Sequence, residues 1–466
     1  MIEPVAELAR LAPDGWLVGG TVRDRVLGRA TADFDVALAG SVADAARDLG
    51  RAAGGYAFEL SEAFGAWRVV AHDHTWQVDL LPLNGATIEE DLGRRDLTIN
   101  AVAAPLGSDG YVDPFGGLED LRHRRLRAVS ADAFRSDPLR TLRLARLACE
   151  LGFHPDAQTL ELARVAAPAL AGVAPERVFA ELRRVICAPA PADGLELMDR
   201  IGATDVVLPE LTALHGVEQS RFHHLDVLGH TRSVLTETIA LEHDPERLGG
   251  ARAAALAQYL ATPLANELTR GQALRFGALL HDIAKPQTRA VTPQGRVTFM
   301  GHDEAGARLT TEILGRLRAA DRLREHVAGL TRHHLRLGFL VHDMPLSRRA
   351  VYDYLRATAP VALDVTVLSV ADRLATRGDN AERAIARHLE LARQMVAEGL
   401  AWVADPPRPP LRGDDLARAL GIKPGPMVGD LLAELEAASF SGEVATRDEA
   451  IARARELIAS ALSCDP

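Results

Sequence analysis

The stretch WLVGGTVRDRVLGRATADFDVAL, residues 16–38, decides the fold of the first part of this chain. Its apolar beginning, Trp16–Val18, predicts a short buried strand, which the pair Gly19–Gly20 ends. A helix over Thr21–Gly28 is predicted to follow at once. A helix N-terminus presents free backbone N–H groups, so this turn is suited to binding phosphate. The guanidinium of Arg23, on the first helical turn, adds a bidentate charge for the same anion.

The same stretch ends in a pair of carboxylates. Asp33 and Asp35 flank Phe34 at the start of an apolar segment. Alternate residues of a strand share a face, so both carboxylates are predicted to point one way and Phe34 into the core. Carboxylates beside a phosphate-binding turn are what Mg²⁺-dependent phosphoryl or nucleotidyl transfer requires. A glycine turn before a helix, or an alternating pair of aspartates, is by itself more often a feature without a catalytic role. The two in this order favour an enzyme.

Length and composition indicate a globular chain of several domains. The 466 residues exceed one ordinary core, so roughly two to four domains are expected. Hydrophobic residues make up 47% of the chain, but no segment has the apolar length that spans a membrane. We therefore expect no membrane partner. Three distant cysteines, Cys149, Cys187 and Cys464, favour neither a disulfide framework nor a zinc knuckle, and a cytoplasmic protein is expected.

Charge is unevenly distributed along the chain. The net charge of −11 argues by itself against a nucleic-acid partner. Residues 121–146, however, contain only two acids against eight arginines: Arg122, Arg124, Arg125, Arg127, Arg135, Arg140, Arg143 and Arg146. Because local charge matters more than the total, this segment is predicted to contact a nucleic-acid backbone.

Residues 1–120 alternate short apolar runs with helical segments, which is typical of an α/β domain. The runs Trp67–Ala71 and Trp76–Leu81 flank a turn and predict a β-hairpin. In the second strand, Asp79 has the register to bring a third carboxylate near the first two. An exposed strand residue without a role is the equally weighted alternative.

A second polar cluster follows in EEDLGRRDLTINAVA, residues 89–103. It contains Arg94, Arg95, Asp96 and Asn100. Because Asp96 and Asn100 are four residues apart, their spacing predicts one face of a helix.

From about Leu121 to the end, helical periodicity dominates the sequence. Residues 133–153 carry apolar side chains at helical spacing, with Asp137, Arg140 and Arg143 on another face. Such an acid–arginine pair on a helix is most often a surface salt bridge. It also has the donors and acceptors to pair with the edge of a nucleic-acid base.

These motifs together resemble the class II tRNA nucleotidyltransferase and bacterial poly(A) polymerase family, which includes CCA-adding and CC-adding enzymes. The motifs are GG-x-V-R-D, D-x-D, RRDLTINA and an E-D-x-x-R-like segment in which Ser136 replaces the glutamate. The resemblance implies that Gly19, Gly20, Arg23, Arg94, Arg95, Asp96 and Asn100 contact the nucleotide's sugar and phosphates. It also implies that Asp137 and Arg140, with Arg143 beside them, read the base, so that the protein acts as the template.

The resemblance further implies an α+β fold in four parts. These are a polymerase-β-like α/β head (1–120), a helical neck and body that bind the base and RNA (121–222), an HD domain (223–380) and a helical tRNA-binding tail (381–466). We expect Asp33 and Asp35 to be catalytic carboxylates that hold Mg²⁺, with Asp79 as the third carboxylate that its strand register brings near them. A helical packing module is the alternative for the tail, because that segment is acidic.

Ten of the sixteen histidines lie between His223 and His342. Their order resembles the HD phosphohydrolase superfamily, because imidazoles and carboxylates hold Mn²⁺, Ni²⁺, Co²⁺ or Fe²⁺ and activate water. We assign one metal to His230, His281, Asp282 and Asp372, and a second to His302 and His334. His333 is nearly as good a candidate as His334, and Lys285 is a candidate phosphate contact. A metal-free scaffold that supports dimerisation is the alternative.

The family's members differ in what they add to tRNA from CTP and ATP. Full CCA-adding relatives have a longer flexible loop before the RRD motif, whereas this chain has only NGATIEEDLG between Leu83 and Arg94. The short loop resembles enzymes that add CC, which leaves the A to a separate enzyme. Alternatives are an A-adding or poly(A) polymerase relative, or a metal-dependent HD phosphohydrolase whose head only recognises RNA.

Overall fold

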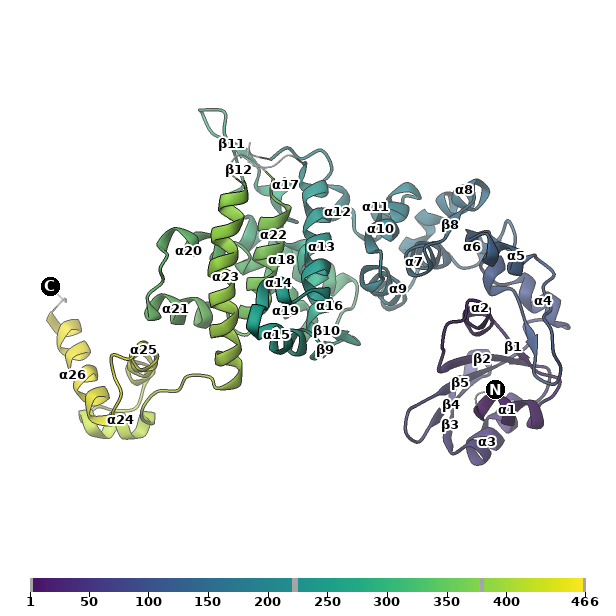
Figure 1. Cartoon of the computed structure of the whole chain (residues 1–466), viewed down its shortest axis with the longest axis horizontal. Helices are drawn as coiled ribbons and strands as arrows, with labels where there is room; N and C mark the ends of the chain where they lie inside the picture. Colours follow the sequence, from purple (N-terminus) through teal and green to yellow (C-terminus); the bar gives the residue numbers. More distant parts are fainter. Residues whose placement is uncertain (1–2, 220–224, 378–380, 464–466) are drawn as a thin grey trace. The chain divides into compact units, whose positions relative to one another are not determined.

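The computed structural model describes residues 3–219, 225–377 and 381–463 of the chain (Figure 1). The chain divides into two compact units, Met1–Val207 and Leu208–Pro466. His223, where the HD domain is predicted to begin, lies outside the described residues, as do residue 380 and Cys464.

A six-stranded sheet in the order β3-β4-β5-β2-β1-β6 forms the head of the first unit (Figure 1). Its strands are β1 Trp16–Leu17, β2 Asp33–Leu38, β3 Gly55–Ser61, β4 Ala66–Ala71, β5 Gln77–Pro82 and β6 Ala104–Pro105. Only β2 and β5 are parallel, and the other neighbours are antiparallel. The predicted first strand and the predicted hairpin are confirmed as β1 and as the pair β4–β5.

Five helices accompany the sheet: α1 Glu3–Leu11, α2 Gly20–Val26, α3 Val42–Ala53, α4 Ile88–Gly93 and α5 Gly117–Arg122. Figure 1 shows α1 and α3 on one side of the sheet and α2 on the other. The side covered by α1 and α3 buries Leu8, Leu49, Phe34 and Val69 in one core. Because Phe34 points into this core, Asp33 and Asp35 lie on the opposite side, as the alternation predicts.

The helix predicted around Asp96 and Asn100 is wrong. Leu97 is extended and forms a β-bridge with Ala128, and only a single 3₁₀ turn, η2, spans Thr98–Asn100. This tertiary pairing outweighs the local helical spacing. The two polar side chains still meet, because Asn100 Nδ2 donates to Asp96 Oδ1 at 3.0 Å.

The rest of the first unit is helical, with one short parallel pair of strands. Its elements are β7 Arg125–Leu126, α6 Ala133–Ser136, α7 Arg140–Leu151, β8 His154–Pro155, α8 Ala157–Ala166, α9 Pro175–Cys187, α10 Pro191–Arg200 and α11 Ala203–Val207. The expected single helix at 133–153 is wrong, because it breaks at Pro138. The residue before a proline avoids helical geometry, and Asp137 is extended with φ −147°. Asp137 therefore does not share a helix face with Arg140.

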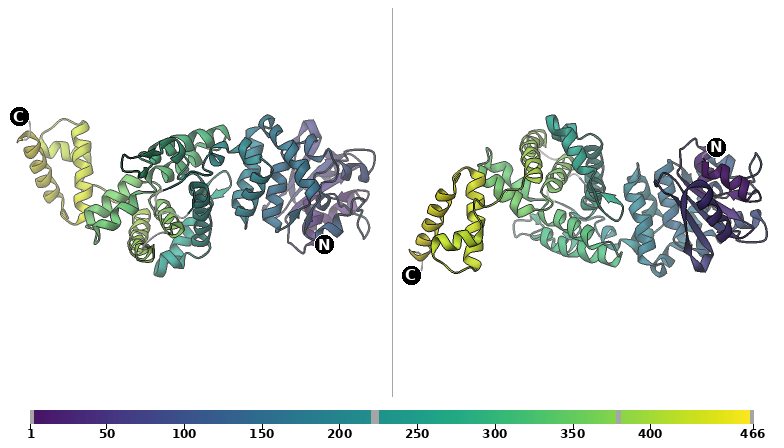
Figure 2. Two further views of the ribbon diagram at one scale, coloured as in Figure 1. Left: turned by 90° about the horizontal axis from the view of Figure 1, so that it is seen from above. Right: turned by 90° about the horizontal axis from the view of Figure 1, so that it is seen from below.

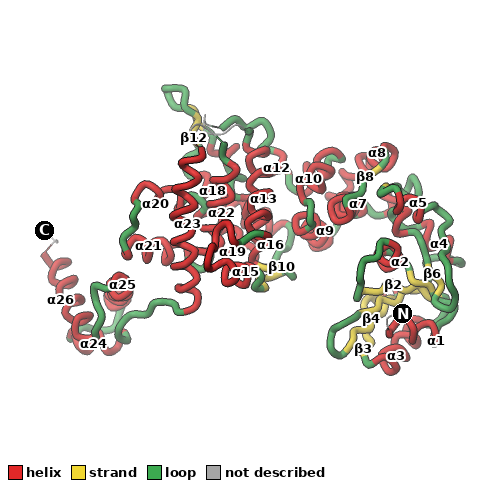
Figure 3. The backbone as a smooth tube through the Cα atoms, in the orientation of Figure 1, coloured by secondary structure: helices red, strands yellow, loops and turns green. Residues whose placement is uncertain are grey.

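The second unit is almost entirely helical, as the strand and helix colours of Figure 3 show. Its helices are α12 Pro209–Thr212, α13 Val227–His243, α14 Glu246–Gly249, α15 Ala253–Leu260, α16 Arg270–Leu280, α17 Lys285–Thr288, α18 His302–Arg316, α19 Asp321–His333, α20 Arg336–Leu340, α21 Arg348–Thr358, α22 Ala362–Ala375, α23 Ala381–Ala404, α24 Gly413–Leu420, α25 Pro426–Ser441 and α26 Arg447–Ser463. Its four short strands are β9 Pro263–Ala265, β10 Leu268–Thr269, β11 Ala290–Val291 and β12 Val297–Thr298. The mixed α+β fold class is confirmed.

Two parts of the second unit have cores of their own. The helix α22 is buried along most of its length and packs against α13, α16 and α23. The last three helices, α24–α26, share a separate core that includes Leu416, Leu431, Leu435 and Ala450. These helices are the yellow group at the C-terminus in Figure 2.

Within the described residues, no single helix is long and apolar enough to cross a membrane. One pair, α21 and α22, meets that test only when its two helices are combined, and they bend by 98° where they meet.

Candidate functional site

The sheet register aligns the candidate carboxylates of the head. Asp35 on β2 lies directly opposite Asp79 on β5. The carboxylate of Asp79, however, is already bound by Arg68 on β4, with Nε–Oδ1 at 2.6 Å and Nη2–Oδ2 at 2.8 Å. The strand register thus brings the third carboxylate beside the first pair, and a bidentate ion pair holds it there.

The surroundings of Asp35 disfavour its charged form. Burial raises the pKa of Asp35, and the neighbouring carboxylate of Asp79 raises it further, although Arg95 and Arg143 partly oppose this. A carboxylate whose charged form is disfavoured in this way gains most from a bound cation. Oxygen ligands are also the donors that Mg²⁺ prefers. The residues present therefore fit a magnesium ion.

Gly19 allows the turn before α2 to approach the carboxylates. Its φ is 65°, a conformation that L-residues with a side chain rarely adopt. A Cβ at this position would lie 3.1 Å from Arg95 Nη1 and 3.4 Å from Asp35 Oδ2. The hydroxyl of Thr21, at the start of α2, accepts a 2.7 Å hydrogen bond from the Asp35 backbone N–H. The start of α2 is thereby fixed against β2.

Arg23 is held in place by two neighbours. Its Nε and Nη2 donate to Asp24 at 3.0 and 2.9 Å, and its Nη1 donates to Asn100 Oδ1 at 2.9 Å. Asn100 in turn donates to Asp96. This chain of hydrogen bonds fixes the guanidinium before any ligand binds.

Asp96 carries a buried charge that Arg143 balances. The side chain of Asp96 is 4% exposed, and its Oδ2 lies 3.1 Å from Arg143 Nε. Burial alone would raise the pKa of Asp96, but Arg143 and the hydrogen bonds from Asn100 and the Leu97 N–H outweigh burial and lower it. Asp96 is therefore an ionised anchor for Arg143, which reaches it from α7.

Arg95 and Arg140 also tie the RRD segment to its surroundings. Arg95 donates twice to Asp91, at 2.9 and 2.7 Å. Arg140 donates to the carbonyls of Arg94, Arg95 and Ala133 at 2.8 to 3.2 Å. Arg140 thus fastens the first turn of α7 to the RRD segment.

A cavity of about 450 Å³ opens where these elements meet. Ten of the predicted site residues line it: Gly19, Gly20, Arg23, Asp33, Asp35, Arg95, Asp96, Asn100, Arg140 and Arg143. Three others are not among its lining: Asp79, Arg94 and Asp137. Arg94 is exposed and donates to Asn84 at 2.6 Å, and Asp137 is bound to Arg177 at 2.9 Å.

Six further residues line the cavity that sequence reasoning does not assign to the site: Thr21, Asp24, Thr31, Arg146, Glu181 and Arg184. The last two come from α9, a helix in which no site residue is predicted from the sequence. Arg146 Nε lies 3.1 Å from Glu181, and Arg184 Nη2 lies 3.1 Å from Glu150. Glu181 and Arg184 are three residues apart and therefore share one face of α9. This spacing is the signal in the sequence that could have found them.

The connection between β5 and α4 is short and fixed. It comprises residues 83–87 only. The Asn84 N–H donates to Asp91 at 3.0 Å, the Ala86 N–H donates to Glu90 at 2.9 Å, and the Thr87 side chain caps α4. Most of its few residues are thus engaged, so this connection has little freedom to move over the cavity.

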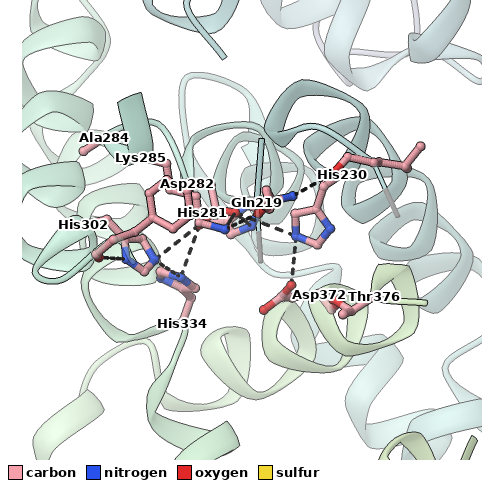
Figure 4. Close-up of polar contacts among 12 residues, drawn as sticks. Gln219, His230, His281, Asp282, Ala284, Lys285, His302, His334, Asp372 and Thr376 are labelled. Carbon is pink, nitrogen blue, oxygen red and sulfur yellow. Dashed lines mark hydrogen bonds and ion pairs between the residues drawn. The ribbon is translucent and has the colours of Figure 1, made fainter. Parts of the chain in front are cut away.

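The second unit gathers the predicted histidines and aspartates in one cluster, in which all members except the half-buried Asp372 are buried (Figure 4). They come from α13 and α22 and from the ends of α16, α18 and α19: His230, His281, Asp282, His302, His334 and Asp372. Two sets of ligand atoms lie within metal-binding distance of one another, and both contain Asp282. One set adds His230 and His281, and the other adds His302 and His334.

Backbone carbonyls orient three of these rings. The Nδ1 atoms of His281, His302 and His334 lie 2.9, 2.7 and 2.6 Å from carbonyls three residues earlier. A carbonyl can only accept, so each Nδ1 carries the proton and each Nε2 is available as a ligand. Two of these Nε2 atoms, on His302 and His334, are 3.2 Å apart and would repel without a cation or proton between them. The cluster fits a divalent metal.

The structure also gives the positions of Asp372, Lys285 and the two adjacent histidines, His333 and His334. Asp372 Oδ1 lies 3.0 Å from His230 Nε2. Lys285 Nζ is bound to Asp282 at 2.6 Å and to Gln219 at 2.7 Å. His334 belongs to the cluster, whereas His333 lines a separate cavity with His326. Burial, with His281 nearby, lowers the pKa of His334 to about 4, so its ring is neutral at pH 7.

Three family descriptions match successive parts of this chain. Residues 15–127 match the poly(A) polymerase head domain, residues 152–214 the probable RNA- and SrmB-binding site of polymerase A, and residues 251–377 the HD domain. An A-adding tRNA nucleotidyltransferase of Deinococcus radiodurans is 37% identical, with 94% of each chain covered. A CC-adding tRNA nucleotidyltransferase of Thermus thermophilus is also 37% identical, covering 94% of this chain and 92% of that one.

Solved structures share the fold over nearly the whole chain. A CCA-adding enzyme in its apo form has a TM-score of 0.64 at 18% identity, covering 98% of this chain and 92% of that one. A Thermotoga maritima CCA-adding enzyme in complex with tRNA has a TM-score of 0.60 at 18% identity, covering 97% and 94%.

Proposed function

Because the chain belongs to the tRNA nucleotidyltransferase family, we propose that it adds two cytidines to the 3′ end of tRNA and stops. Each addition consumes CTP and releases pyrophosphate. The observation that carries the proposal is the connection 83–87, which is short and hydrogen-bonded. An enzyme that changes from C to A must reshape its nucleotide pocket, and this connection provides no mobile segment for that. A separate enzyme would then add the A.

The head residues have distinct roles in this proposal. The N–H groups of the Gly19–Gly20 turn and the guanidinium of Arg23 bind the triphosphate. Since Arg23 is already held by Asp24 and Asn100, little side-chain entropy is lost on binding. Asp33 and Asp35 would hold Mg²⁺, which activates the tRNA 3′ hydroxyl and neutralises charge on the triphosphate. The 3′ oxygen then bonds to the α-phosphorus as the bond to pyrophosphate breaks.

Asp137 and Arg140 are proposed to read the base. A carboxylate accepts from the amino group of cytosine, and a guanidinium donates to its ring nitrogen and carbonyl. The support is Arg140, which begins α7 and lines the cavity, while Asp137 lies three residues earlier and outside the lining. Asp137 would have to exchange its 2.9 Å ion pair with Arg177 for the base. The arginine-rich segment 121–146 would bind the tRNA backbone without reading sequence.

A tRNA that lacks its 3′ CCA tests the cytidine step. With CTP alone, we expect the purified protein to lengthen this tRNA by two residues and then stop, read on a single-nucleotide gel. Growth by one residue, or continued growth, would contradict the proposed count. The same tRNA with ATP alone is the control lane and is expected to stay unchanged.

A second function is proposed for the cluster around Asp282, namely metal-dependent hydrolysis of a phosphate ester. The specific support is the convergence of three oriented Nε2 atoms on one buried carboxylate. A metal there would supply an activated water.

Metal content tests this second site. We expect the purified protein to retain a divalent transition metal, measured by mass spectrometry of the elements, and His281→Ala to lose most of it. His333→Ala is the matched control, because His333 lies next to His334 but outside the cluster. Nucleotide addition should be unchanged in both variants. Equal metal loss in the two variants, or a metal-free wild type, would exclude the site.

A further inference from the structure

One row of side chains crosses four strands of the head sheet. Asp35 on β2 lies opposite Asp79 on β5, Asp79 opposite Arg68 on β4, and Arg68 opposite Phe58 on β3. Partners in register point to the same side of a sheet. Phe58 therefore shares its face with the candidate carboxylates. Three strand spacings separate it from Asp35, which is about 14 Å.

Aromatic side chains are exposed at the β3 end of this row. Phe58 is 46% exposed, and Tyr56, two residues earlier on the same face, is 61% exposed. The ring of Tyr56 rests edge-on against His72, with ring centroids 4.2 Å apart. The opposite face of the same strands is closed by α3, and Val69 and Val78 are buried there. The exposed aromatic rings thus belong to the open face only.

The nucleotide cavity lies on the other side of Asp35. Its lining comes from the Gly19 turn, α2, the RRD segment, α7 and α9. Among the described residues, none from β3, β4 or β5 lines it. If the nucleotide occupies that cavity, the β5, β4 and β3 side of the carboxylates stays outside it and is available to the RNA end that attacks the nucleotide.

We propose that Tyr56 and Phe58 form a stacking platform for the unpaired 3′-terminal nucleotides of tRNA. The inference rests on the proposed function, because it requires the RNA 3′ hydroxyl to lie at Asp33 and Asp35. Bases stack on aromatic rings with little regard to sequence, as an enzyme acting on every tRNA requires. Between the platform and the carboxylates, the charge of Arg68 is balanced by Asp79. The face is therefore suited to bases rather than to phosphates.

Kinetics of nucleotide addition test the platform. We expect Phe58→Ala and Tyr56→Ala each to raise KM for tRNA by about tenfold, the loss of one base–aromatic contact. KM for CTP should not change, because the platform lies outside the nucleotide cavity. Phe58→Tyr should restore the wild-type KM for tRNA. Tyr111→Ala is the matched control: it removes a head aromatic that is 43% exposed and outside these three strands.

A stacking measurement that needs no turnover separates this inference from the proposed function. The tRNA carries 2-aminopurine as its last unpaired base, and binding to the wild type should quench the fluorescence. The variant with both alanines should bind without that quenching. Unchanged quenching and unchanged KM in a folded double variant would overturn the platform. A wild type that adds no nucleotide would overturn the proposed function, and the fluorescence would still decide the platform.

Discussion

Replacing Asp35 by asparagine is expected to lower the rate of nucleotide addition by a factor of about a thousand or more. Asparagine keeps the shape of the side chain but removes the charge that binds a divalent cation. Asp35 faces the cavity from the centre of the sheet, and burial together with Asp79 already raises its pKa. The measurement is single-turnover addition of one cytidine to tRNA that lacks its 3′ CCA.

The control for this variant is Asp48→Asn on α3. Asp48 lies on the helix that covers the opposite face of the sheet and pairs with Arg51 at the surface. Its loss should leave the rate within about twofold of the wild type, because exposed pairs contribute little. Near-normal addition by Asp35→Asn would show that these carboxylates are not the catalytic pair.

Replacing Arg143 by methionine is expected to lower the free energy of unfolding by about 2–4 kcal/mol. Methionine fills much of the same space but leaves the Asp96 carboxylate buried without its cation. The matched control is Arg135→Met. Arg135 pairs with Asp132 at the surface, so its loss should cost about 1 kcal/mol or less.

The loss of stability in Arg143→Met should depend on pH, because the pKa of Asp96 is shifted in the folded protein. In the folded wild type the pKa of Asp96 is lowered. The Asp96–Arg143 pair therefore stabilises the protein fully at pH values above the pKa of Asp96 in the unfolded chain. This stabilisation is lost as the pH falls and Asp96 becomes protonated. The difference between wild type and Arg143→Met should therefore be full at pH 7 and shrink in acid. Urea unfolding of both proteins at several pH values measures it. A difference that does not depend on pH would mean that Arg143 acts only by packing.

Strand alternation explains why the centre of the head is predictable. The pattern Asp33, Phe34, Asp35 determines which side chain enters the core, and the hairpin that follows places Asp79 opposite Arg68. Both depend on local period and turn chemistry. The pairing of Asp79 with Asp35 is not local, because it joins the parallel strands β2 and β5, and neither strand alone determines that register.

Two of the predicted helices are wrong for different reasons, one in the head and one in the neck. The spacing of Asp96 and Asn100 suits a helix, but the bridge between Leu97 and Ala128 requires an extended backbone. Asp137 directly precedes Pro138, and the proline prevents Asp137 from adopting helical geometry. The proline is visible in the sequence and should have ended the predicted helix there.

For the metal cluster too, the sequence pattern predicts some features and three-dimensional contacts decide the others. The order of histidines and aspartates is enough to select its members. The choice between His333 and His334 is not, because adjacent residues on a helix differ only in direction. The carbonyl of Thr331 orients the His334 ring and Asp282 lies beside it, and neither contact can be read from spacing.

The most direct test of the central claim offers ATP to a tRNA that already ends in CC. If the connection 83–87 prevents the change from C to A, this tRNA should stay the same length under conditions in which CTP extends a tRNA that lacks all three residues. Addition of a single A would contradict the account and make the protein a complete CCA-adding enzyme.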